Sequence, residues 1–262
     1  MTSRVPAAEQ TLAVLRYLSR QAGPVPAAAV AREAGLPRST AYHLLNVLVE
    51  NGFVVHLPEE RRYGLGVAAF ELGSAYARQA PLARLARPVL ARLVDRVGES
   101  AHLAVLHGRE VLYVVEDRAA GRPPLVTDVG VRLPAHLTAS GRAMLADLPA
   151  AQVRALFPDR SAFVDRTGIG PAGLPDLRRV LAEVRRRGHA VEDGEVGAGL
   201  ASVAAAVHDH TGHPVAGVAV TYPTDPAAPP ARPVADLDTL VTAVRATAAE
   251  LTRRLGGVPP RR

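Results

Sequence analysis

The sequence predicts an α+β protein with two parts, a small helical part that ends in a β-hairpin and a larger part built on an antiparallel sheet. Near the N-terminus, three stretches with helical hydrophobic spacing precede two short strand-like segments. Further along, two pairs of apolar segments each surround a short polar turn, and amphipathic helical segments lie between the pairs. Helices interspersed with hairpins favour an antiparallel sheet over a parallel one.

The N-terminal part is predicted to contain three helices, at about residues 9–21, 26–34 and 37–51. The first has three leucines on one side: Leu12, Leu15 and Leu18. Gly35 follows the second helix and Pro37 begins the third, and these are ordinary stop and start signals. Two helices joined by a tight turn that contains glycine are typical of a DNA-binding helix-turn-helix.

The third helix has two faces. Its apolar side chains recur at helical spacing: Ala41, Leu44, Leu45 and Leu48. The polar side chains of the other face and the N-terminal end are candidate DNA contacts: Arg38, Ser39, Thr40, Tyr42, His43 and Asn46. They would offer donors, acceptors and a cation to a major groove. For this helix alone, a solvated polar face is the alternative.

Residues 53–57 and 62–65 flank the turn at 58–61 and predict a hairpin directly after the third helix. Arg61 and Arg62 lie near its tip. A hairpin that carries arginine after a recognition helix indicates the wing of a winged helix-turn-helix, with contacts to phosphate or a minor groove. We therefore expect a DNA-binding domain at residues 1–66.

A helix at 67–80 is expected to link the two parts and to place large apolar groups between subunits: Phe70, Leu72 and Tyr76. Pro81 then breaks the pattern, and Pro88 is expected to kink the following amphipathic helix or to mark its start. The second domain is assigned to 81–256, and the tail at 257–262 is expected to be disordered. In this second domain, strands are expected at 100–106, 110–116, 201–207 and 215–222. Further helices are expected at 150–157, 175–187 and 237–255.

Composition limits the function classes. The net charge of +6 is compatible with nucleic-acid binding. All 31 basic residues are arginine. The absence of cysteine excludes disulfides, thiol catalysis and thiolate metal sites. The N-terminus lacks a signal-peptide core and no apolar run reaches membrane-spanning length, so we expect no membrane contact and a cytoplasmic location.

Several segments, in order along the chain, resemble the IclR family of bacterial transcriptional regulators: GLPRSTAYHLLNVLVENGFV, RYGLGVAAFELG, VGVRLPAHLTASGRAMLA and VRRRGHAVEDGE. The resemblance extends from about Glu9 to Leu255. It implies a winged helix-turn-helix, a linker helix and a GAF-like effector domain. It also implies homodimers or dimers of dimers, a double-stranded DNA operator, a small organic effector and no cofactor.

By position, the resemblance implies an effector site made of Ala139, Ser140, Gly141, Glu192, Ser202, Ala219 and Thr221. Some members have Asp, Cys and two Ser where this chain has Glu192, Ser202, Ala219 and Thr221, so a relative's effector should not be assumed. Free N–H groups at a helix start near Ser140 would favour a carboxylate. Alternatively, Thr138 or Ser140 only caps that helix.

Three other sequence patterns are explained without a functional site. Residues 168–173 fit GxGxxG but lack the preceding strand, so we interpret them as a loop. A group of possible metal ligands, His208, Asp209, His210 and His213, is better explained as a polar turn, because side chains at a strand end diverge. No GxSxG or HExxH motif supports catalysis. We expect a ligand-responsive regulator, favouring a repressor. The alternatives are a metal-responsive regulator and a DNA-tethered small-molecule enzyme.

Overall fold

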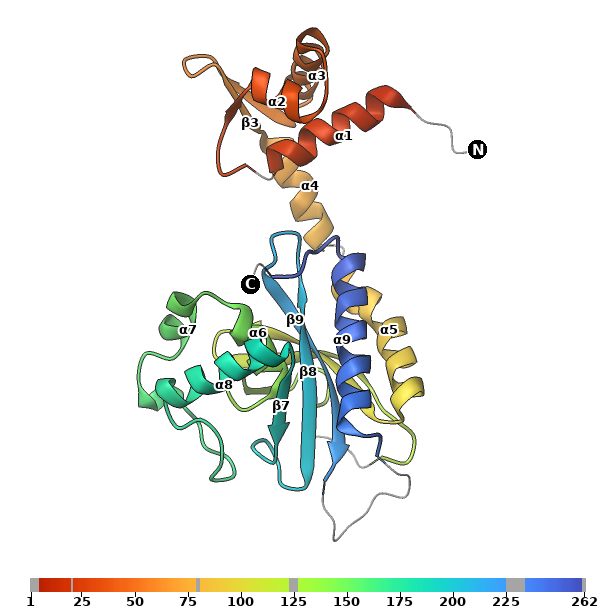
Figure 1. The fold of residues 1–262 in the computed structure, drawn as a ribbon, viewed down its shortest axis with the longest axis vertical. Helices are drawn as coiled ribbons and strands as arrows, with labels where there is room; N and C mark the ends of the chain where they lie inside the picture. Colours follow the sequence, from red (N-terminus) through yellow and green to blue (C-terminus); the bar gives the residue numbers. More distant parts are fainter. Residues whose placement is uncertain (1–4, 20, 79–80, 123–126, 225–233, 261–262) are drawn as a thin grey trace. The chain divides into compact units, whose positions relative to one another are not determined.

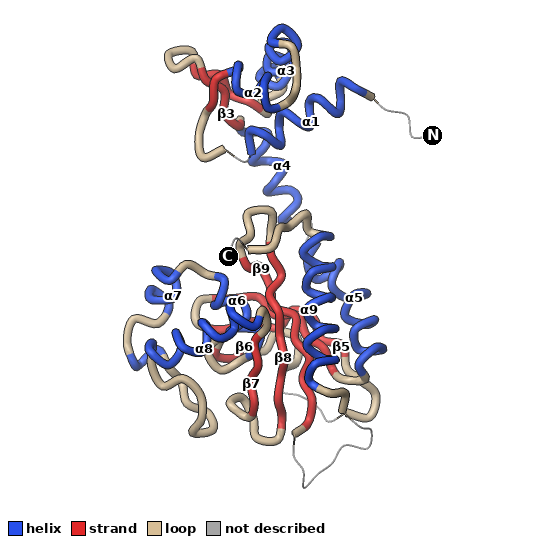
Figure 2. The backbone as a smooth tube through the Cα atoms, viewed as in Figure 1, coloured by secondary structure: helices blue, strands red, loops and turns tan. Residues whose placement is uncertain are grey.

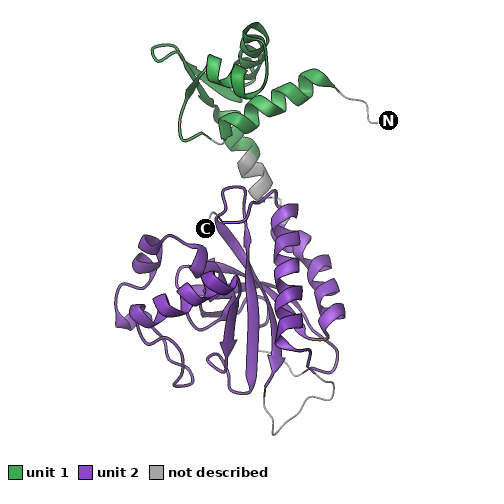
Figure 3. Cartoon of the chain, in the orientation of Figure 1, with its two compact units in different colours: residues 1–81 green, residues 82–262 purple. Residues whose placement is uncertain are grey.

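The computed structural model describes residues 5–19, 21–78, 81–122, 127–224 and 234–260. The chain forms two compact units, residues 1–81 and 82–262 (Figure 3). No helix among these described residues combines the length and apolarity needed to cross a bilayer.

The first unit packs helices α1 (Pro6–Ser19), α2 (Ala27–Glu33) and α3 (Arg38–Glu50) with a small antiparallel sheet, and α4 (Val67–Arg78) follows the sheet (Figure 1). Its strands are β1 (Val25–Pro26), β2 (Val54–Leu57) and β3 (Arg62–Leu65), in the order β1-β3-β2. The core includes Val14, Leu18, Val30, Leu45, Leu48 and Tyr63. The expected leucine stripe of α1 is wrong in one respect, since Leu12 is 52% exposed and Val14 is buried in its stead.

The turn between α2 and α3 and the hairpin follow the sequence signals. Gly35 has a φ of 65°, which a residue without a Cβ adopts at no steric cost. The β2–β3 hairpin pairs Val54 with Leu65 and Leu57 with Arg62. Arg61, in the turn, has a φ of 53°. The predicted three-helix domain with its hairpin is therefore confirmed.

The second unit is a six-stranded antiparallel sheet with helices on both faces (Figures 1 and 2). Its strands are β4 (Ser100–His107), β5 (Glu110–Asp117), β6 (Arg132–Pro134), β7 (Ala190–Asp193), β8 (Leu200–His208) and β9 (Pro214–Pro223). Their order is β6-β5-β4-β9-β8-β7. Its helices are α5 (Pro81–Val97), α6 (Ala139–Asp147), α7 (Ala150–Leu156), α8 (Leu174–Arg187) and α9 (Leu237–Arg254), with a short 3₁₀ turn at Arg160–Ala162.

Alternation along the strands builds two cores, one on each face of the sheet. On β8, Val203, Ala205 and Val207 face α5 and α9, while Ala204 faces α6. Aliphatic side chains of α5 and α9 fill the core on one face of the sheet. Side chains of α6, α7 and α8 fill the core on the other face. The face under α6 has small side chains, so that helix lies close to the sheet.

Three details differ from the expectations. Strands β6 and β7, at the two edges of the sheet, were not predicted. Helix α5 starts at Pro81 and continues through Pro88, so Pro88 does not mark its start. The tail was expected to be disordered from residue 257, but Gly257 N donates to Thr252 O and Val258 N to Asp209 O. Residues 261–262 lie outside the described residues.

Candidate ligand pocket and nucleic-acid interface

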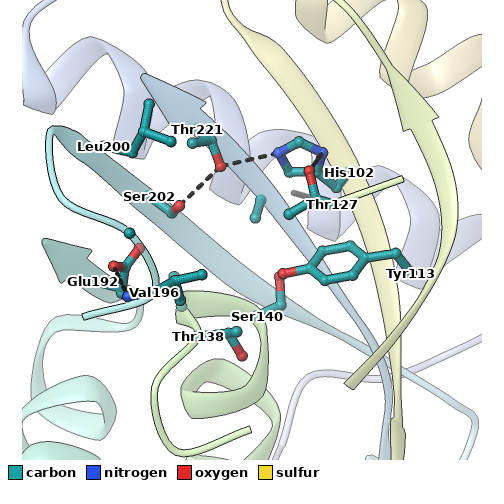
Figure 4. Close-up of a pocket in the computed structure, with 13 residues that line it drawn as sticks. His102, Tyr113, Thr127, Thr138, Ser140, Glu192, Val196, Leu200, Ser202 and Thr221 are labelled. Atoms are coloured by element: carbon teal, nitrogen blue, oxygen red, sulfur yellow. Dashed lines mark hydrogen bonds between the residues drawn. The ribbon is translucent and has the colours of Figure 1, made fainter. Parts of the chain in front are cut away.

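A cavity in the second unit lies between the start of α6, the centre of the sheet and the β7–β8 loop (Figure 4). It holds about 530 Å³ of space free of protein atoms, part of it open to solvent. Its lining comprises His102, Tyr113, Thr127, Thr138, Ala139, Ser140, Glu192, Val196, Gly197, Leu200, Ser202, Ala219 and Thr221. The structure thus brings together six of the seven residues that the sequence suggested for an effector site.

The start of α6 supplies hydrogen-bonding groups to the cavity. Thr138 is the N-cap, because its Oγ1 accepts a hydrogen bond from Gly141 N at 3.1 Å. Ser140 is therefore not the cap. It is 1% exposed, lines the cavity, and its Oγ has no hydrogen-bond partner among the described residues. A buried hydroxyl without a partner is costly, so this atom can gain by meeting a ligand or a water.

Gly141 is not among the residues that line the cavity, and its N–H already donates to Thr138 Oγ1. A Cβ at this position would lie 2.2 Å from the carbonyl oxygen of Ala135. A Cβ at Gly217, on β9, would lie 2.8 Å from the carbonyl oxygen of Ser140. The two glycines allow the backbone of α6 to lie against its neighbours, which positions Ser140.

Opposite α6, a chain of hydrogen bonds crosses the sheet (Figure 4). Ser202 Oγ and Thr221 Oγ1 are 2.8 Å apart, and Thr221 Oγ1 is 3.0 Å from His102 Nε2. The other ring nitrogen of His102 is 3.3 Å from Thr127 Oγ1. Burial lowers the pKa of His102 to about 3, and the charge of Arg118 adds to this. The imidazole is therefore neutral near pH 7.

Glu192 closes the cavity from β7. Its side chain is buried, and Oε1 accepts a hydrogen bond from Val196 N at 3.0 Å. Burial is the main cause that raises the pKa of Glu192 to about 7, and the charge of Glu195 adds to it. Hydrogen bonds from Val196 N and Ser202, and the charge of Arg142, act in the opposite direction. Near neutral pH the carboxyl group is therefore partly protonated.

Several lining residues were missed at the sequence level: His102, Tyr113, Thr127, Thr138, Val196, Gly197 and Leu200. His102 pairs across the sheet with Ala219, so correct strand registration would have identified it. Thr127 lies outside the strands, and no local signal places it beside His102. From the sequence, Thr138 is indicated only as a possible helix cap.

The candidate DNA-reading face of α3 is exposed. Ala41 and Leu45 are fully buried, whereas the polar candidates on the other face are exposed, apart from the half-buried Thr40: Arg38, Ser39, Tyr42, His43 and Asn46. In the hairpin, Arg61 is exposed. Arg62 is also exposed, but one guanidinium nitrogen donates to Pro24 O at 3.0 Å. Arg61 is thus the more available of the two for a phosphate.

The signals set aside from the sequence belong to ordinary turns. Asp209 Oδ1 accepts hydrogen bonds from Thr211 N, Thr211 Oγ1 and His213 N, so it organises the β8–β9 turn. His208 Nε2 lies 2.9 Å from Asp147 Oδ2. No group of three or more possible metal ligands occurs within the described part of the chain. Residues 168–173 form a loop in which Gly168 N donates to Asp165 Oδ1.

Comparison with known proteins places both units in one family. Residues 7–58 match the model of the IclR helix-turn-helix domain, and residues 74–253 match the bacterial transcriptional regulator IclR C-terminal model. The glycerol operon regulatory protein of Streptomyces coelicolor is 33% identical over 256 residues, which cover 98% of each chain. The transcriptional repressor IclR of Escherichia coli is 29% identical, covering 85% of this chain and 81% of the relative. A crystal structure of an IclR-type regulator from Silicibacter sp. TM1040 has a TM-score of 0.73 and 27% identity, covering 98% of each chain.

Proposed function

The chain belongs to the IclR family of bacterial transcriptional regulators, and from that premise we propose that it is a repressor whose operator binding responds to a small carboxylate held in the cavity beside Ser140. The relatives are regulators and not enzymes, so the chemistry of the cavity is binding. A regulator that binds chromosomal DNA acts in the cytoplasm of a bacterial cell.

One observation carries the assignment of the effector site: the buried Ser140 hydroxyl lines a cavity at the start of α6 and has no hydrogen-bond partner within the described part of the chain. The first N–H groups of a helix have no acceptor within the helix, and they favour an anion. A carboxylate could therefore accept from Ser140 Oγ and from these N–H groups. Ser202 and Thr221, across the cavity, could bind a hydroxyl or carbonyl oxygen of the same molecule.

A neutral polyol is the second candidate effector. No arginine lines the cavity in the described structure, and the chain contains no lysine. Relatives from two Streptomyces species, at 33% and 34% identity, are named glycerol operon regulatory proteins. A polyol would use the hydroxyl and carboxyl partners of the cavity without placing a second negative charge in it.

We further propose that the exposed face of α3 reads the operator. Arg38→Ala should weaken binding by about 1–3 kcal/mol if the guanidinium pairs with a guanine edge. A single winged helix covers little DNA, so a two-fold symmetric dimer reading paired half-sites is proposed. On α4, Phe70 is 75% and Leu72 65% exposed, and these apolar groups are candidate subunit contacts. The Tyr76 side chain lies outside the described residues.

The test combines gel-shift and melting measurements on the full chain. DNA from the region upstream of its own gene is titrated with and without small acids and polyols. An effector at about a hundredfold excess over its Kd should stabilise the fold by about 2.7 kcal/mol. This corresponds to roughly 2–4 °C per kcal/mol for a domain of this size.

The variants Ser140→Leu and Ser202→Leu should keep operator binding and lose the response, because they fill the cavity. Ser161→Leu, at an exposed serine outside this cavity, is the matched control. A wild-type response from folded Ser140→Leu and Ser202→Leu proteins would place the effector elsewhere.

A further inference from the structure

An anionic ligand in this cavity would lie beside a buried carboxyl group, with no cationic side chain in the described lining to balance the two charges. Glu192 is 3% exposed and lines the same cavity as the free Ser140 hydroxyl. Among the described lining residues none is cationic, because His102 is neutral and neither arginine nor lysine lines the cavity. Two carboxylates in one buried site repel each other strongly, and one of them takes up a proton.

We propose that Glu192 is the selectivity residue of the cavity and binds a small hydroxycarboxylate only in its protonated form, so that effector binding takes up a proton. This inference rests on the proposed function and adds the chemistry of its ligand. The free carboxylate of Glu192, the ligand carboxylate and one proton from solvent combine into a complex with a neutral Glu192. No other bond forms or breaks.

The position of the proton follows from the existing hydrogen bonds. Oε1 of Glu192 accepts from Val196 N at 3.0 Å and stays an acceptor. The proton therefore belongs on Oε2, from which it can be donated to a ligand carboxylate once the Ser202 hydroxyl, which also contributes a hydrogen bond to this carboxyl group, donates to Thr221 Oγ1 instead. Ser140 Oγ and the α6 N–H groups can donate to the same carboxylate from the other side of the cavity. The site then satisfies an anion with donors alone, without a cationic side chain.

Several charged and titratable groups lie around Glu192. On the β7–β8 loop, Glu195 pairs with Arg142 of α6 at 2.7 Å and also accepts from Asp193 N. From β5, burial raises the pKa of the Tyr113 hydroxyl above its ordinary value. Asp193 on β7 and Tyr222 on β9 are next to Glu192 and Thr221 along their strands, so they lie on the other face of the sheet; burial is the main cause that raises the pKa of Tyr222. His102 on β4 lines the cavity and is neutral.

The expected pH dependence can be stated as a fold-change. The pKa of free Glu192 is raised to about 7, chiefly by burial. If the complex keeps the proton through pH 8, linkage lowers the affinity for a carboxylate by about tenfold between pH 6 and pH 8. Below pH 6 the affinity should level off, because Glu192 is already protonated.

The test uses lactate and glycerate as carboxylate probes and glycerol as the neutral analogue of glycerate. Isothermal titration of the full wild-type chain at pH 6, 7 and 8 should show the tenfold fall for the acids and no such fall for glycerol. Repeating the pH 8 titration in two buffers of different ionisation enthalpy should give an uptake of about 0.9 proton per acid bound. This count uses the wild-type protein and does not depend on whether a variant folds.

Glu192→Gln mimics the protonated side chain. It should bind the acids at pH 8 about tenfold more tightly than wild type, with no pH dependence. Glu99→Gln is the matched control, because Glu99 is also fully buried, and burial is the main cause that raises its pKa to about 7, but it does not line the cavity. This variant should keep the wild-type fall.

The outcomes separate the two proposals. Acid binding that is flat with pH, or without proton uptake, overturns the role of Glu192 and leaves the effector site intact. Binding of glycerol alone, with neither acid binding at pH 6, overturns the carboxylate class and leaves a ligand-responsive regulator. If none of the three compounds binds at pH 6, both the role of Glu192 and the small hydroxycarboxylate class are overturned, and the family assignment stands.

Discussion

Gly141→Ala tests whether the start of α6 is held by close backbone packing. The added Cβ would lie 2.2 Å from the Ala135 carbonyl oxygen and 2.5 Å from its Cα. Both atoms are backbone, so they cannot rotate away as a side chain can. The start of α6 would have to move by about 1 Å to restore ordinary contact, and Ser140 would move with it.

The cost can be worked from three contributions. Forcing a backbone shift in a packed region costs about 1–3 kcal/mol. Displacing Gly141 N from Thr138 Oγ1, 3.1 Å away, would remove an N-cap bond, which costs about 1 kcal/mol. Alanine recovers about 1 kcal/mol because it favours helix over glycine. The net loss is about 2 kcal/mol, or roughly 4–8 °C in the Tm of the second unit.

Thermal unfolding by circular dichroism or calorimetry measures this loss. Gly197→Ala in the same unit is the matched control, because a Cβ there meets nothing within 4 Å and its backbone does not need glycine. Its Tm should stay near that of wild type. A Gly141→Ala protein that also melts within 1 °C of wild type would refute the argument that close packing fixes the start of α6.

Three further results are expected. Thr138→Ala should lower the stability of the second unit by about 1 kcal/mol in denaturant titrations, because it removes the α6 cap; an unchanged midpoint would mean that another group caps the helix. Arg61→Ala should weaken binding to all DNA sequences about equally and reduce the salt slope by about one, measured by gel-shift at several salt concentrations; a sequence-dependent loss would instead assign Arg61 to base reading. Burial raises the folded pKa of Glu99 and Glu192 from 4.5 to about 7. Their contribution to stability is therefore present below pH 4.5 and is lost as the pH rises to 7. Glu99→Gln should remove roughly half of that loss in melting curves across this range, and an unaltered pH profile would contradict this expectation.

The parts of the fold that the sequence predicted are those governed by local rules. Helix α3 has a 3.6-residue pattern, a glycine before it and a proline at its start, and its buried and exposed faces follow from these alone. Strands β6 and β7 have three and four residues. Such short segments show too little alternation to be distinguished from loop, and they become strands because a longer neighbour offers hydrogen bonds.

The same distinction applies to the cavity. Ser140 and Ser202 could be placed there because family motifs mark them. His102 and Thr127 come from different segments, and their contact depends on tertiary structure that neither segment encodes. Gly141 belonged to the same motif as Ser140, but its role is packing, since its position against Ala135 depends on tertiary structure.

Regulation requires that the effector bind one state of the protein more tightly than the other. A tenfold change in operator affinity needs the effector to bind one state about 1.4 kcal/mol more tightly than the other. A ligand at a hundredfold excess over its Kd stabilises the state that binds it by about 2.7 kcal/mol, which is about twice that difference. Only part of the cavity wall therefore has to differ between states. The β7–β8 loop fits this role: it is irregular backbone, Val196 N and Gly194 N hold it to Glu192 Oε1 and Leu200 O, and Glu195 links it to Arg142. Under the proposal for Glu192, its protonation would weaken the first of these bonds and the effector would add a partner on Oε2. The loop would then respond to the proton and the ligand together.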